Sequence, residues 1–137
     1  MLLRNVVVTG SLVLLLVSFS SAKPRKNRMG NGLWGGEHIR INVSANSAMI
    51  EYDCAQGTIA GPLLMDSKGR FIWHGTHLRE HGGPIRSDET ANRSPAVYTG
   101  YIRGGKMKLT VKLKGTNQTM GTFSLMQGAE GKVFKCR

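Results

Sequence analysis

Apolar and polar residues alternate with a period of two in several short runs of this chain. The clearest run is 106–114, where Met or an aliphatic residue at every odd position up to 113 alternates with Lys or Thr. This period places the apolar side chains on one face of a β-strand and leaves the other face in water. Gly104 and Gly105, just before the run, supply the positive φ angles of a two-residue hairpin turn. The pattern predicts an antiparallel hairpin of 98–103 with 106–114.

The same kind of alternation predicts an all-β fold. Segments rich in Gly, Pro, Asn, Asp and Ser separate the runs, and these residues favour turns. Sequential antiparallel strands with short connections favour an up-and-down meander that closes as a small eight-stranded β-barrel, with a two-sheet β-sandwich as the alternative. The predicted strands are 37–43, 48–54, 58–65, 70–74, 96–103, 106–114, 120–126 and 132–136.

The amino-terminal region has the organisation of a secretory signal peptide. Residues 1–22 contain a positive charge at Arg4, an apolar run and a final Ser-Ser-Ala. The apolar run is too short and too interrupted to favour a membrane span, so we expect a secreted or periplasmic protein. Residues 23–32 are basic and contain Pro and Gly, which predicts a flexible leader. Residues 33–137 are then expected to form one β-barrel domain, as a monomer.

Cys54 and Cys136 are the two cysteines of the chain. An oxidising compartment allows them to pair, and we expect a disulfide bond. Cys54 shares strand parity with Tyr52, and Cys136 shares it with Phe134, so both thiols are predicted to point toward an apolar face. Two free buried thiols are the alternative.

The formal net charge is +11. Such a charge biases the protein toward anionic partners through an attraction that salt screens, and we expect a small molecule or an anionic envelope component. Lysines on outward strand faces also prevent edge-to-edge pairing. Strands that read nucleic acid carry several stacking aromatics beside the basic residues, whereas here only Tyr101 shares parity with Arg103. Specific nucleic-acid binding is therefore not expected.

Residues 75–95 are rich in Gly, Pro, His and charged side chains, which predicts a long loop of the kind that often carries function. His74, His77 and His81 lie in or next to it. Imidazoles bind zinc or copper, so the three side chains form a candidate metal site if Gly75 bends the chain. Polar loop histidines without a metal are the simpler interpretation.

The same loop contains Arg79 and Glu80, and a carboxylate beside a histidine permits acid/base chemistry of the hydrolase type. No nucleophile is identifiable, so non-catalytic binding is the favoured function. Inward-facing aromatics would line a small apolar pocket at the barrel mouth. The candidate ligand-binding residues are Trp34, Trp73, Arg79, Glu80 and Tyr98.

Gly32-Leu33-Trp34, just before the first predicted strand, resembles the Gly-x-Trp signature of lipocalin-like barrels of the calycin group. The resemblance implies a barrel in which this Trp plugs one end and a basic residue near the last strand packs over its ring. Lys135 or Arg137 stands at the corresponding place. Three further runs resemble small exported bacterial proteins of unassigned function, a resemblance that implies no activity: 34–38, 79–84 and 134–136.

Overall fold

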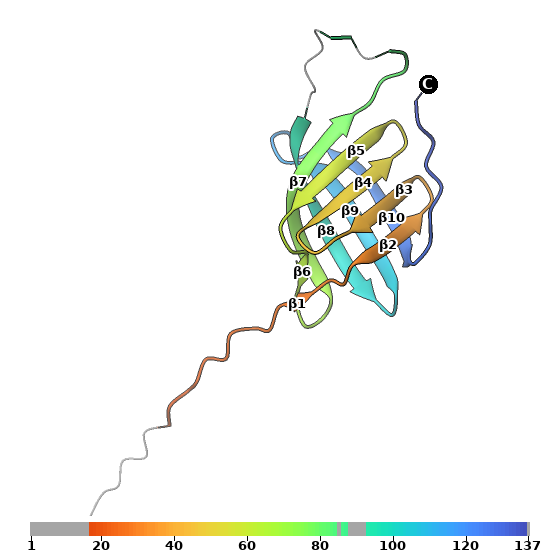
Figure 1. The fold of residues 1–137 in the computed structure, drawn as a ribbon. Helices are drawn as coiled ribbons and strands as arrows, with labels where there is room; N and C mark the ends of the chain where they lie inside the picture. The colour runs from red at the N-terminus through yellow and green to blue at the C-terminus, as the bar shows by residue number, and fades with distance from the viewer. Residues whose placement is uncertain (1–16, 85, 88–92, 137) are drawn as a thin grey trace, which may run out of the picture.

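Eight antiparallel strands close into a barrel in the computed structural model, which describes residues 17–84, 86–87 and 93–136 (Figure 1). Neighbours around the barrel follow the chain order, and the last strand pairs with the first to close it. The predicted meander is confirmed, and the sandwich alternative is wrong. The strands are β2 (Gly32–Gly36), β3 (Ile39–Val43), β4 (Ser47–Tyr52), β5 (Ala55–Ala60), β7 (Arg70–Arg79), β8 (Arg93–Arg103), β9 (Lys106–Leu113) and β10 (Thr119–Gln127).

The hairpin of β8 and β9 forms as the alternation predicts. Arg103 pairs with Lys106, and Gly104 and Gly105 between them have φ angles of 58° and 73°. Positive φ at both central positions is the geometry of a type I′ turn, which matches the twist of the paired strands. Met107, Leu109 and Val111 of β9 are buried while Lys106 and Lys108 are exposed, so the inward and outward faces are those expected.

One of the predicted strands is wrong, and a different segment takes its place. Residues 132–136 form no strand, and Lys132 makes only an isolated parallel bridge with Glu37. The eighth strand is β2, which the sequence pattern did not reveal because glycines break its alternation. Those glycines have a structural reason. A side chain at Gly35 would overlap the backbone of residues 129–131, which passes directly over β2.

The predicted loop 75–95 is shorter than expected, since β7 continues to Arg79 and β8 begins at Arg93. The chain does not bend at Gly75, which pairs with Ile59 on one side and Ala96 on the other. The glycine instead allows a close approach, because a side chain there would overlap the carbonyl oxygen of Thr58. A glycine that suggested a loop is thus an interior strand residue.

Part of the predicted leader packs against the barrel. β1 (Asn27–Arg28) pairs with β6 (Leu64–Met65), and the following Met29 is 4% exposed. The apolar side chain of Met29 accounts for this contact, since its burial removes apolar surface from water. The signal peptide expected for residues 1–22 lies largely outside the described residues. Within the described part of the chain, no helix is long and apolar enough to cross a membrane.

The barrel has two ends with different closures. The disulfide end carries the Glu37–His38 and Asp53–Cys54 turns, the end of β7 and the carboxyl terminus (Figure 1). The β6 end carries the β8–β9 turn and the β5–β7 connection, which contains β6. Apolar side chains from the strands fill the interior between the two ends, with Tyr98 and Leu109 among those that are fully buried.

Candidate functional site

The carboxyl-terminal residues 128–136, here called the strap, run back along β2 to the disulfide end (Figure 1). Lys132 makes backbone hydrogen bonds with the end of β2 and the turn that follows it. Its N–H donates to Gly36 O at 3.0 Å, and its carbonyl accepts from His38 N at 2.7 Å. Further along, the carbonyl of Phe134 accepts a hydrogen bond from Cys54 N at 3.2 Å. The strap therefore connects the β2–β3 turn to the β4–β5 turn.

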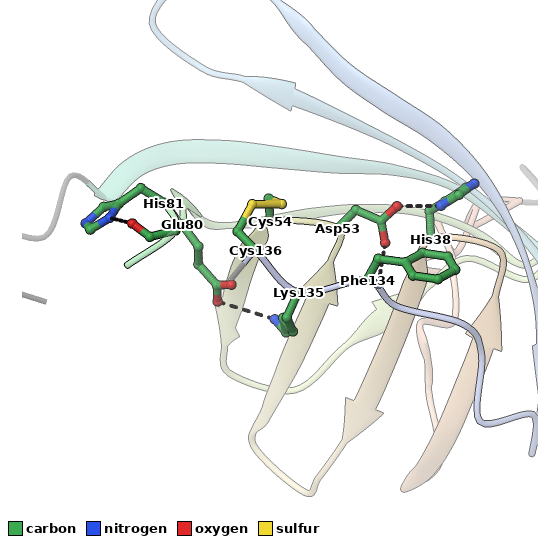
Figure 2. Close-up of a disulfide and its surroundings, with 9 residues drawn as sticks. His38, Asp53, Cys54, Glu80, His81, Phe134, Lys135 and Cys136 are labelled. Carbon is green, nitrogen blue, oxygen red and sulfur yellow. Dashed lines mark hydrogen bonds and ion pairs between the residues drawn. A yellow bond between two sulfur atoms is a disulfide. The ribbon is translucent and has the colours of Figure 1, made fainter. Parts of the chain in front are cut away.

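A disulfide bond between Cys54 and Cys136 fastens the end of the strap, as predicted (Figure 2). Their Cα atoms are 4.9 Å apart. Cys54 lies in a turn with φ 52°, outside β4, so the strand parity on which the predicted direction of its thiol rested does not apply to it. Its carbonyl accepts a hydrogen bond from Glu80 N at 2.8 Å, so the disulfide also adjoins the end of β7.

Asp53 organises the polar contacts beside the disulfide (Figure 2). One carboxylate oxygen lies 2.5 Å from Nδ1 of His38, and the other accepts a hydrogen bond from Phe134 N at 2.7 Å. Both oxygens are thus engaged. Phe134, whose parity suggested a core position, is 63% exposed, because the strap lies on the outside of the barrel.

A cavity of about 260 Å³ opens at the disulfide end. Its walls come from the inward faces of β4, β5 and β7 and from β10 on the other side of the barrel. The lining residues are His38, Tyr52, Asp53, Cys54, Ala55, His77, Arg79, Met120 and Phe123. Tyr52 pairs with Ala55, and Ala55 pairs with Arg79, so three adjacent strands deliver neighbouring side chains to one wall.

Two polar atoms of residues that line this cavity are buried and make no hydrogen bond of ordinary geometry to the described residues. They are Oη of Tyr52, which is 5% exposed, and Nδ1 of His77, which is 7% exposed. The two rings lie close together, with centroids 5.4 Å apart. Buried polar groups in native proteins nearly always have partners, and each exception needs an explanation. Two exceptions in adjacent side chains mark this cavity as the candidate functional site.

Burial determines the protonation of these groups. It raises the pKa of Tyr52 far above its usual value, with smaller contributions from the charge and the hydrogen-bonding hydroxyl of neighbouring Tyr98, and it raises the pKa of Tyr98 to about 12. Burial also lowers the pKa of His77, and the nearby charge of Arg79 lowers it further. At neutral pH the cavity therefore presents a protonated phenol and a neutral imidazole.

Gly57 makes room for the aromatic groups. It pairs with Ile50 and His77, and a side chain at this position would overlap the hydroxyl oxygen of Tyr98. That hydroxyl donates a hydrogen bond to Thr76 O at 2.6 Å. Tyr98 is thus satisfied directly beside the unpartnered Tyr52.

The structure brings some of the predicted ligand-binding residues together and separates others. Arg79 lines the cavity, while Glu80 follows it and pairs with Lys135 at 3.3 Å. Trp34 is buried in the core, where it pairs with Gln127 near the β6 end. Trp73 also lies away from the cavity, and its indole N–H donates to Leu64 O at 2.8 Å.

Several residues of the site were not among the predicted site residues. Tyr52 and Phe123 have inward parity, which predicts core positions and a lining of the pocket at the barrel mouth, but parity does not reveal the unpartnered hydroxyl. His38 reaches the cavity from the β2–β3 turn and Met120 from β10, and the two share no motif. A usable signal was present in His77, a polar residue that shares the inward parity of Phe71 and Trp73.

The three histidines of the predicted metal site do not converge. His74 is exposed on the outer face of β7, whereas His77 is buried on its inner face. His81 lies beyond the strand, where Nδ1 is 2.9 Å from Gly82 O. The prediction required a bend at Gly75, and the strand runs through it. No group of three potential metal-binding side chains occurs among residues 17–84, 86–87 and 93–136.

A larger hollow of about 810 Å³ lies at the β6 end and is lined in part by Trp73 and His74. Several of its polar groups already have partners. Arg70 forms an ion pair with Asp66 at 2.9 Å, and the Trp73 indole is hydrogen-bonded. This hollow therefore lacks the unsatisfied groups that distinguish the smaller cavity.

The basic residue expected over the Trp34 ring is not Lys135, which pairs with Glu80 at the disulfide end. Arg137 lies outside the described residues. In the described part of the chain, the cation–ring contact is that of Arg103 over Tyr101, at 5.9 Å.

The chain matches no known protein family, no curated protein and no solved structure.

Proposed function

We propose that this chain is an exported, non-catalytic binding protein that holds a small organic ligand in the cavity at its disulfide end. The observation that carries the proposal is the pair of unpartnered atoms, Tyr52 Oη and His77 Nδ1, among aromatic and apolar walls. Mostly apolar cavities with a few convergent polar groups are typical of small-molecule sites.

The two buried polar atoms affect the energetics of ligand binding. A buried donor or acceptor without a partner costs about 1–3 kcal/mol. A ligand that hydrogen-bonds to Tyr52 and His77 would recover this free energy on binding. The cavity of about 260 Å³ is near the lower limit of typical ligand pockets, about 300 Å³, which favours a compact ligand.

Binding is favoured over catalysis by the composition of the cavity walls. His38 beside Asp53 is an arrangement that permits acid/base chemistry. However, the described lining residues include no serine or threonine, and their one cysteine is in the disulfide bond. Without a nucleophile or a convergent histidine cluster, both the hydrolase and the metal-binding alternatives lose geometric support.

Two further features support this proposal. The disulfide bond favours an oxidising compartment, which agrees with export to the periplasm or the medium. The closed antiparallel barrel with a site at one mouth is compatible with a lipocalin-like protein, although the cavity is shallow because apolar side chains fill the interior.

Native mass spectrometry tests the proposal on untagged protein purified from the exported fraction of its source cells. We expect a noncovalently bound organic mass in a fraction of the wild-type protein. The matched variant is Ala55→Leu, which places a larger side chain in the cavity wall and should lack that mass. An identical spectrum for the two folded proteins, with no bound mass in either, would contradict the proposal.

A further inference from the structure

From the chemistry of the cavity walls we infer the class of the ligand: a small aromatic carboxylate, with its carboxylate at Arg79 and its ring against the contacting rings of Tyr52 and Phe123. This inference rests on the proposed binding function and goes beyond it, because it assigns a charge, a ring and an orientation to the ligand.

The charge follows from Arg79. Among the charged side chains that line the cavity, Asp53 has both oxygens engaged, and His38 is its partner. Nearby Glu80 is paired with Lys135. Arg79 is the lining cation with no anionic partner among the described residues, and it is close enough to His77 to affect its pKa. A guanidinium binds a carboxylate through two parallel hydrogen bonds.

The ring follows from the walls. Tyr52 and Phe123 contact each other, with ring centroids 5.6 Å apart, and form an aromatic wall to which Ala55 and Met120 add apolar surface. A ligand ring can pack edge-to-face or offset-stacked on these aromatic rings, and the flexible Met side chain makes favourable sulfur–ring contacts. An aliphatic carboxylate would match the charge of Arg79 but would lose the ring contacts.

The orientation follows from the depth of the groups. Arg79 is exposed at the mouth, whereas Tyr52 and His77 are buried. A carboxylate at the mouth therefore directs the opposite edge of the ring toward the unpartnered hydroxyl and imidazole. A hydroxyl group on that edge can both donate and accept a hydrogen bond. The cavity volume of about 260 Å³ equals that of about nine molecules of liquid water, which fits one substituted ring.

The probe pair is 4-hydroxybenzoate and 4-hydroxybenzamide, which share a shape and differ in charge. Isothermal titration with the full mature chain gives the affinities, and backbone amide shifts of Ala55 and Met120 report whether the probe enters the cavity. We expect the benzoate to bind wild-type protein about tenfold to a hundredfold more tightly than the amide, as a charge-assisted hydrogen bond predicts. Tyr52→Phe should weaken 4-hydroxybenzoate but not benzoate.

Arg79→Gln should remove the preference for the acid, so that the two probes bind with similar affinity. The matched control is Arg103→Gln, which lowers the net charge equally at the β6 end and should preserve the preference. Equal loss in both variants would attribute the preference to the overall charge and overturn the inference.

The outcomes separate this inference from the proposed function. Equal binding of acid and amide, with shifts at Ala55 and Met120, overturns the carboxylate assignment and leaves a binding cavity. Failure of both probes overturns the inference alone if native mass spectrometry finds another organic ligand. Failure of both probes together with a bare native protein contradicts the proposed function as well.

Discussion

The two ends of the barrel differ in how their buried groups are satisfied. At the β6 end, Met29 and Leu63 pack into the core, and the one indole N–H of Trp73 has a carbonyl partner. At the disulfide end, Tyr52 and His77 are equally buried but each has a polar atom without a partner. Buried polar side chains are thus hydrogen-bonded at the β6 end, as is usual in protein interiors, but these two at the disulfide end are not.

This difference indicates that the interior of the β6 end is optimised for stability and that the interior of the disulfide end is not. Natural proteins tend to leave unfavourable local features, such as unpaired buried polar groups, at functional sites and to offset their cost with stabilising contacts elsewhere. Here the stabilising contacts lie beside the unpaired groups. The disulfide of Cys54 and Cys136 and the hydrogen bonds of the strap hold the end whose interior is incompletely paired.

The largest effect should come from removing the disulfide with Cys54→Ser and Cys136→Ser together. The bridge spans 82 residues, for which the chain-entropy relation gives about 4.5 kcal/mol as an upper value. We expect the free energy of unfolding in urea to fall by about 4 kcal/mol. Hydrogen exchange should rise at the strap more than at β1 and β6. A uniform rise throughout the barrel would contradict the independence of the two ends.

A smaller loss is expected for Gly57→Ala. The added methyl group would overlap the Tyr98 hydroxyl and lie 2.8 Å from the carbonyl oxygen of Thr76. Overpacking of this kind costs about 1–3 kcal/mol, which urea denaturation can measure. The control is Gly115→Ala, where no atom lies within 4 Å of the added carbon. Equal stability of the two variants would mean that Gly57 is not needed for the packing of the tyrosines.

The barrel itself was predictable because it depends on a repeated pattern. The Met107–Leu113 alternation and the Gly104-Gly105 turn each encode local geometry, and that geometry is present. Strand β2 could not be predicted because its glycines are required by the strap, which packs against them but lies far later in the chain. Gly75 suggested a loop for a similar reason: the residues around it in the sequence do not show that the Thr58 carbonyl lies close to it.

The candidate site was only partly predictable. Arg79 was recognised from its charge within a polar segment, and the structure places it at the cavity. The unpartnered state of Tyr52 depends on what surrounds its hydroxyl in space, which parity alone does not contain. His77 was interpreted as a metal ligand, whereas its burial separates it from His74 on the other face of β7.

The acid limb of the stability curve should report on the buried His77. The pKa of His77 is lowered in the folded state, so its stabilising contribution is complete above the unfolded pKa of about 6.5 and is lost as pH falls through the folded value. We expect His77→Leu to flatten the decline in urea midpoint below about pH 6.5. A decline in His77→Leu as steep as in the wild type would contradict the assignment.

The smallest expected effect tests the central claim most directly: the free energy of unfolding of Tyr52→Phe compared with Tyr98→Phe. Tyr98→Phe removes the hydrogen bond to Thr76 O and should cost about 1 kcal/mol. Tyr52→Phe removes a hydroxyl without a partner and should leave stability unchanged or raise it by up to about 1 kcal/mol. If Tyr52→Phe instead destabilises the protein as much as Tyr98→Phe, its hydroxyl is satisfied within the protein, which would contradict the proposed binding site at the disulfide end.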